Sequence, residues 1–93
     1  MAVGIRIQFA GLSQAEFDEV NKHVDPDSNP PKGLLFHASG PIDSGWGVID
    51  FWESREDFDA FQNRIQSSVE AAGVEMNGAP DIKEFPVHEH FPR

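Results

Sequence analysis

The 93-residue sequence contains no cysteine. Neither a disulfide framework nor a thiolate metal site nor a cysteine nucleophile is therefore possible, and the absence fits a reducing compartment. No segment approaches the ~20 consecutive apolar residues that a membrane-spanning helix needs. The first twelve residues, MAVGIRIQFAGL, also lack the basic and apolar regions of a signal peptide. We therefore expect a cytoplasmic protein.

Basic residues are few: 7 Lys and Arg stand against 16 Asp and Glu, a formal net charge of −9. Such a surface repels nucleic-acid phosphates and anionic lipids, and no basic stripe interleaved with aromatic residues counters this. A glycine-rich phosphate loop, a serine nucleophile elbow and a paired-carboxylate constellation are absent as well. We expect neither nucleic acid nor a membrane as a partner.

What the sequence does have is clear periodicity. Residues 3–9 alternate between apolar and small or polar side chains and predict a first strand. Ser13 and Glu16 form an S-x-x-E capping box that predicts a helix over 14–23. The segment 25–32, DPDSNPPK, contains three prolines and predicts a loop.

The second half of the chain repeats this order. Residues 33–40 predict a second strand, with Leu34, Phe36 and Ala38 on one face and Leu35, His37 and Ser39 on the other. Residues 45–53 complete a hairpin, and a helix begins after Ser54 and runs to about Ala72, because apolar residues recur every three or four positions. Residues 81–88 predict a fourth strand, which Pro86 places at a sheet edge.

The resulting order, β-α-β-β-α-β, predicts an α+β, ferredoxin-like fold with a four-stranded antiparallel sheet, in a single domain over residues 1–93. The first and third strands would lie in the middle of the sheet, and both helices would cover one face.

The run GWGVIDFWES, residues 45–54, carries large side chains on both faces of one strand. We expect Ile49 and Phe51 to join the core that the helices cover. The open face would then carry Trp46, Val48, Asp50, Trp52, Arg6 and Gln8. Because such a patch is too apolar to stay in contact with water, we expect a homodimer whose sheets face each other. The assignment of faces depends on parity alone, so a β-bulge would invert it.

This element order, together with the run VIDFWESREDFDAF at the third strand and second helix, resembles the antibiotic biosynthesis monooxygenase-like family of dimeric α/β-barrel proteins. The sequence is most similar to small, uncharacterised actinobacterial-type members, in which W-E-S-x-E-x-F-x-x-F opens the second helix. The resemblance implies sheet-to-sheet dimerisation and a pocket between sheet and helices. Characterised relatives oxidise aromatic polyketides without a prosthetic group, or degrade haem.

The haem-degrading relatives pair a strand asparagine with a tryptophan and a histidine of the second helix. Here Ile5, Arg6 and Ile7 stand in the first strand, the second helix contains no histidine, and Phe61 stands where monooxygenase-like sequences often carry one. These departures from the pattern of the haem-degrading relatives argue against a haem site, and we expect no cofactor.

Two residues are candidates for proton transfer. His37 lies in the middle of a strand and could act as a general base near neutral pH; the alternative is a structural, hydrogen-bonded histidine. Asp50 could orient a phenolic substrate or accept its proton; the alternative, which we favour, is an ion pair with Arg6 of the adjacent strand.

Trp46 and Trp52, with Arg6, are candidates for binding a flat aromatic ligand, and dimer-interface packing is an equal alternative for the tryptophans. His88 and His90 of the HEH run share a strand face, but two ligands are too few for a metal unless His37 supplies a third, so we expect none.

Three functions remain open. The chain could be a cofactor-independent oxygenase acting on a small aromatic substrate, a non-catalytic module that binds a small hydrophobic ligand, or a dimeric protein whose role is purely structural. A pocket beside His37 would favour the first two, and an interface filled by Trp46 and Trp52 would favour the third.

Overall fold

The computed structural model describes residues 2–76, 78–89 and 91. Its elements follow the expected order: β1 (Val3–Ala10), α1 (Gln14–Val24), β2 (Leu34–Ile42), β3 (Gly45–Trp52), α2 (Arg55–Ala72) and β4 (Asp81–Pro86). The predicted ferredoxin-like α+β fold is confirmed, with element ends within two residues of those expected. Neither helix combines the length and the apolar character that crossing a bilayer requires, as judged over the described residues.

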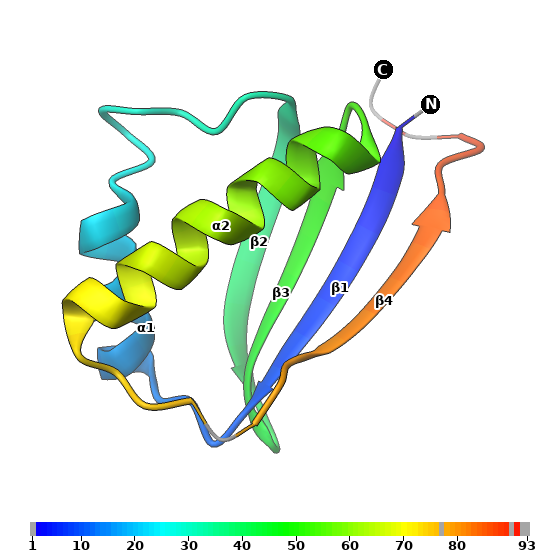
Figure 1. Cartoon of the computed structure of the whole chain (residues 1–93). Coiled ribbons are helices and arrows are strands. Elements are labelled where there is room, and N and C mark those ends of the chain that lie inside the picture. Colours follow the sequence, from blue (N-terminus) through cyan, green and yellow to red (C-terminus); the bar gives the residue numbers. More distant parts are fainter. Residues whose placement is uncertain (1, 77, 90, 92–93) are drawn as a thin grey trace.

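The four strands form one antiparallel sheet in the order β2-β3-β1-β4. As expected, β1 and β3 are central, and β4, which ends at Pro86, is an edge strand. Both helices lie on the same face of the sheet, with α2 crossing it diagonally (Figure 1). The sheet therefore has a covered face and an open face, and these two terms are used below.

The helix ends form where the sequence indicates. The Oγ atom of Ser13 accepts from the backbone N–H of Glu16 at 3.1 Å, and the Glu16 carboxylate accepts from the N–H of Ser13 at 3.0 Å, which completes the capping box. Ser54 caps α2 more simply, because its Oγ accepts from the backbone N–H of Asp57 at 3.2 Å. Gly73 ends α2 with φ 69°, a left-handed conformation that glycine adopts without steric penalty.

The register between β1 and β3 overturns the expected assignment of faces. Val3 lies opposite Trp52, Ile5 opposite Asp50 and Phe9 opposite Trp46. Because directly opposed residues project from the same face, both tryptophans and Asp50 lie on the covered face with the apolar residues of β1. Parity divides β3 into two sets but cannot say which set meets the helices, and the placement predicted above was wrong.

The tryptophans are core residues of the monomer. Trp52 is 0 % exposed and packs against Phe58 and Phe61, with ring centroids 6.0 and 5.2 Å away. Trp46 is 7 % exposed and stacks on Phe17 of α1 at 5.0 Å. Burying one indole contributes on the order of 5 kcal/mol of hydrophobic stabilisation. Neither indole N–H has a hydrogen-bond partner among the described residues, so shape and apolar contact hold these rings.

A β-bulge interrupts β2. Leu34 pairs with Trp52, but Phe36 pairs with Phe51, so Leu35 is the extra residue. After the bulge, His37 lies opposite Asp50 on the covered face, and Phe36 points from the open face. The expectation that Leu34 shares a face with Phe36 was therefore wrong, because the bulge reverses the alternation between them.

The open face carries a row of aromatic rings from three strands, Phe36, Phe51 and Phe85, called the aromatic row below. Phe51 lies 6.1 Å from Phe36 and 6.4 Å from Phe85, measured between ring centroids. Phe36 and Phe85 are 55 % and 53 % exposed, and Ile49, on the same face, is 50 % exposed. Phe85 folds over Gly4, where an added Cβ would lie 2.5 Å from the ring.

The ion pairs that arginine and lysine form among the described residues lie at the surface. Arg6 on the open face pairs with Asp81 at 3.2 Å. Arg55, at the start of α2, hydrogen-bonds Glu84 of β4 and Asp59 of its own helix, and these two carboxylates raise the pKa of its guanidinium above the ordinary value. The Arg55 cluster therefore fastens α2 to the edge of the sheet while remaining exposed to solvent.

Candidate functional site

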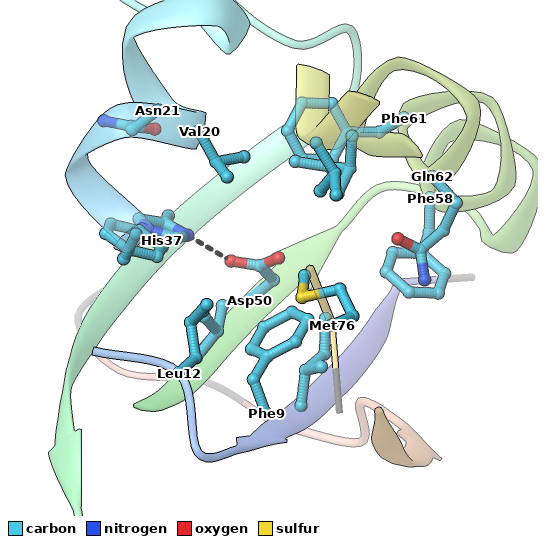
Figure 2. A pocket seen from close by; sticks show the side chains of 15 residues that line it. Phe9, Leu12, Val20, Asn21, His37, Asp50, Phe58, Phe61, Gln62 and Met76 are labelled. Carbon is cyan, nitrogen blue, oxygen red and sulfur yellow. Dashed lines mark hydrogen bonds and ion pairs between the residues drawn. The ribbon is translucent and has the colours of Figure 1, made fainter. Parts of the chain in front are cut away.

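A pocket opens between the covered face of the sheet and the two helices (Figure 2). Its cavity volume is about 70 Å³. Fifteen described residues line it, drawn from the three strands β1, β2 and β3, both helices and the segments beside them. Eleven are apolar: Ile7, Phe9, Leu12, Phe17, Val20, Val48, Phe58, Phe61, Ile65, Val69 and Met76. The other four are Asn21, His37, Asp50 and Gln62.

His37 and Asp50 meet in this pocket. They occupy opposed positions of β2 and β3, and Nδ1 of His37 lies 2.6 Å from Oδ1 of Asp50. The Asp50 side chain is 4 % exposed, whereas that of His37 is 41 % exposed. The pair therefore runs from the interior of the pocket to its mouth, with the carboxylate inside and the imidazole reaching solvent.

This geometry fixes the hydrogen-bonding roles when Asp50 is ionised. A carboxylate can only accept, so Nδ1 of His37 carries the proton and donates it to Asp50. While the imidazole is neutral, the second ring nitrogen, Nε2, has a free lone pair. A buried carboxylate that orients an imidazole and stabilises its protonated form is the arrangement of a general base with its orienting partner.

The proposed structural alternative for Asp50 is wrong. Ile5 is the residue of β1 that lies opposite Asp50, and Arg6 lies opposite Ile49. The Arg6 side chain therefore projects from the open face, away from Asp50. Its partner is Asp81, and the partner of Asp50 is His37. The two candidate proton-transfer residues are therefore brought together by the sheet.

The three candidate ligand-binding residues lie elsewhere. Trp46 and Trp52 are packed beneath the helices and are not among the residues that line the pocket. Arg6 lies on the open face. Their roles in binding a substrate stay predictions, and the pocket beside His37 is formed without them.

Two polar residues of the pocket were missed in the sequence. Gln62 of α2 is half-buried, and Asn21 of α1 is exposed at the rim. Gln62 follows Phe58 by four positions and so shares the inward stripe of its helix. A glutamine inside an otherwise apolar stripe is a signal that could have identified it.

The expected absence of a metal site is untested at His90, which lies outside the described residues; His88 is described. Across residues 2–76, 78–89 and 91, no group of three or more His, Cys, Asp or Glu side chains could hold a metal ion.

No protein-family model and no curated protein matches the sequence. Solved structures match the fold. A candidate antibiotic biosynthesis monooxygenase from Caulobacter crescentus superposes with a TM-score of 0.68 at 18% identity, over 95% of this chain and 91% of that one. A mutant of SnoaB, a cofactor-independent oxygenase from Streptomyces nogalater, gives 0.63 at 13% identity, over 99% and 97%. A dimeric ferredoxin-like protein of unknown function from Thermobifida fusca gives 0.66 at 13%, over 94% and 92%.

These similarities establish the fold at identities too low to carry a function. The structural neighbours are antibiotic biosynthesis monooxygenase-like and other ferredoxin-like proteins, as the sequence resemblance implied, and one is described as dimeric. The narrower resemblance to actinobacterial-type members finds no support in these matches and stays a prediction.

Proposed function

We propose that the chain is a cofactor-independent, monooxygenase-like enzyme that acts on a small aromatic substrate in the pocket between sheet and helices. The observation that carries the proposal is the His37–Asp50 pair, joined at 2.6 Å inside an otherwise apolar pocket. The likeness in fold to SnoaB, a cofactor-independent oxygenase, supports the same reaction class.

In the proposed reaction, Nε2 of His37 takes the proton of a substrate hydroxyl. Asp50 holds the imidazole in the tautomer that can accept and stabilises the imidazolium that forms. The apolar walls supply few competing hydrogen bonds, so the electrostatic effect of the pair is strong there. Since the His37 side chain is 41 % exposed, its proton can pass on to solvent.

Deprotonation makes the ring electron-rich, and dioxygen is the oxidant. For a phenol, the overall change converts one phenol and one O₂ into one quinone and one water. Two hydrogens leave the substrate, one oxygen atom enters the ring and the other leaves as water, so atoms and electrons balance. The chain's own contribution is to bind the ring, orient its hydroxyl and move the proton.

The test is oxygen uptake with a panel of single-ring hydroxyarenes, with products identified by mass spectrometry. We expect His37→Ala and Asp50→Asn each to lower kcat/KM by ~100-fold, within the usual range for a lost acid–base group. His23→Ala is the matched control, because the His23 side chain is 40 % exposed and lies outside the pocket. Unchanged turnover in His37→Ala would refute the acid–base role.

A non-catalytic function is the alternative, either as a small-ligand-binding protein or as a purely structural dimer. The small volume of the pocket, about 70 Å³, favours the structural dimer over both functions that need a ligand, and the likeness to a dimeric protein of unknown function supports the same alternative. Ligand binding without oxygen uptake under the same conditions would establish the binding alternative.

We also propose that two copies of this single-domain chain pair through their open faces. The support is the aromatic row, with Phe36 and Phe85 more than half exposed, flanked by the half-exposed Ile49. Apolar surface of this kind, gathered on one face, is typical of an interface. The predicted facing-sheet dimer is thus retained, although its apolar residues are Phe36, Phe51 and Phe85 and not the tryptophans.

A further inference from the structure

We infer that the pocket selects uncharged, single-ring hydroxyarenes that carry a second hydrogen-bonding group, and that Gln62 is the residue that recognises this second group. The inference rests on the proposed function, because it assigns the substrate hydroxyl to the His37–Asp50 pair. It assigns a binding role to Gln62, a residue that takes no part in the proton transfer.

The volume of the pocket limits the ring system. An apolar cavity of about 150 Å³ is known to hold one benzene molecule. The pocket here has about half that volume, 70 Å³, and is open at its mouth. A single ring with part of its edge toward the mouth is therefore the largest group it takes while Phe58 and Phe61 keep their packing against Trp52.

The charge of the pocket disfavours anions. None of the described residues that line it is a lysine or arginine, and Asp50 is a carboxylate of which only 4 % is exposed. His37 is the one described cationic candidate, and it is already bound to Asp50. While Asp50 is ionised, the pair carries a net charge of zero or minus one. A carboxylate ligand would therefore lose its hydration and meet like charge.

Gln62 provides the second point of recognition. It enters from α2 on the opposite side of the pocket from His37, with Asp50 between them (Figure 2). Its side-chain amide makes no hydrogen bond to another described residue, and the residue is half-buried. An amide offers both a donor and an acceptor, so it can bind a carbonyl or a hydroxyl without favouring a charged ligand.

Four probes separate these requirements: a reference compound and three others, each of which differs from the reference in one property. The reference is para-hydroxyacetophenone, which has a phenol and an uncharged carbonyl. In para-hydroxybenzoate the methyl group is replaced by a charged oxygen, para-ethylphenol lacks the carbonyl, and acetylnaphthol adds a second ring. Binding is followed by amide NMR titration below the phenol's ionisation range and without oxygen, so that no turnover is needed.

We expect the reference ketone to bind at least ~10-fold more tightly than the benzoate and the naphthol. Gln62→Leu should weaken the ketone about fivefold, the size of one neutral hydrogen bond, and leave ethylphenol unchanged. Gln66→Leu is the matched control: it is the same substitution on the same helix, at an exposed position outside the pocket.

Equal affinity for ketone and benzoate would overturn the inference about charge, and an unaltered ketone affinity in Gln62→Leu would overturn the role of Gln62. Absence of shifts at the pocket residues with all four probes would overturn the inference as a whole. None of these results decides the proposed function, because that is tested by oxygen uptake in His37→Ala and Asp50→Asn.

Discussion

The two faces of the sheet are built from the same strands and differ in almost every other respect. On the covered face, Asp50 lies between Val48 and Trp52, close to His37, and all but the imidazole is shielded by helices. On the open face, Ile49 and Phe51 alternate with those residues; Ile49 is half exposed, and Phe51 is partly buried. One strand, β3, therefore contributes residues both to the pocket and to the aromatic row.

The apolar character of β3 therefore has two separate causes. The tryptophans are buried within the monomer, so they contribute to its folding free energy. Two rings of the aromatic row, Phe36 and Phe85, are more than half exposed in the monomer and gain further stabilisation only when something covers them. Substitutions on the two faces should therefore change two different quantities, the free energy of unfolding and the dimer dissociation constant.

Loss of a tryptophan from the covered face should destabilise the monomer most. Trp52→Ala removes a fully buried ring and should lower the free energy of unfolding by about 3–5 kcal/mol, measured by urea denaturation. The control is Leu35→Ala at the bulge, where the side chain is 53 % exposed and a loss below ~1 kcal/mol is expected. Equal losses in the two variants would mean that Trp52 is not part of the core.

A charge on the open face should weaken the dimer. Phe51→Asp places a charge in the middle of the aromatic row and should raise the dimer dissociation constant ~30-fold or more, as seen by sedimentation equilibrium. Gln66→Asp adds the same charge at an exposed position of α2 and should leave assembly unchanged. A wild-type chain that is monomeric at micromolar concentration would refute the facing-sheet dimer.

A smaller effect on the free energy of unfolding is expected for the His37–Asp50 pair, which places polar groups on the covered face. Asp50→Ala removes the partner of His37 and should cost about 1 kcal/mol of stability, whereas replacing both His37 and Asp50 by valine should cost nothing or stabilise. Thermal and urea unfolding of the two variants measure this. If the double variant were the less stable one, the pair would be a structural device rather than a functional one.

The smallest effect is expected for the ion pair at the edge of the open face. Asp81→Asn breaks the ion pair with Arg6, whose side chain is 35 % exposed, and should change monomer stability by less than ~0.5 kcal/mol. Denaturation at low and high salt measures it, since an exposed pair is screened by salt. A larger, salt-insensitive loss at dimer-forming concentration would show that the open face, and this pair with it, is covered.

Periodicity and capping residues were sufficient for the fold. The Ser13–Glu16 box and the regular apolar spacing along α2 are local signals, and both helices formed where those signals lie. The site was only half predictable. His37 and Asp50 could be named as residue types suited to proton transfer, but that they meet depends on the pairing of β2 with β3 and on the bulge, which sequence spacing does not encode.

The faces were mistaken for a related reason. The alternation in β3 is equally strong on both sides, because Trp46 and Trp52 on one side match Ile49 and Phe51 on the other in apolar character. Only the cross-strand partners decide which set meets the helices. Gln62 could not be assigned to the pocket from its spacing alone, because a polar residue on a helix is usually solvated and only the packing of α2 on the sheet turns this one toward the pocket.

The bulge in β2 has a consequence for how this strand can change in length. Within a regular strand, losing one residue turns every later side chain over. Here Leu35 is the surplus residue, so a chain without it could pair Leu34 with Trp52, Phe36 with Phe51 and His37 with Asp50 in one unbroken ladder. Sequences one codon shorter at Leu35 would therefore keep the pocket intact, whereas a deletion beyond His37 would have to invert one end of the strand.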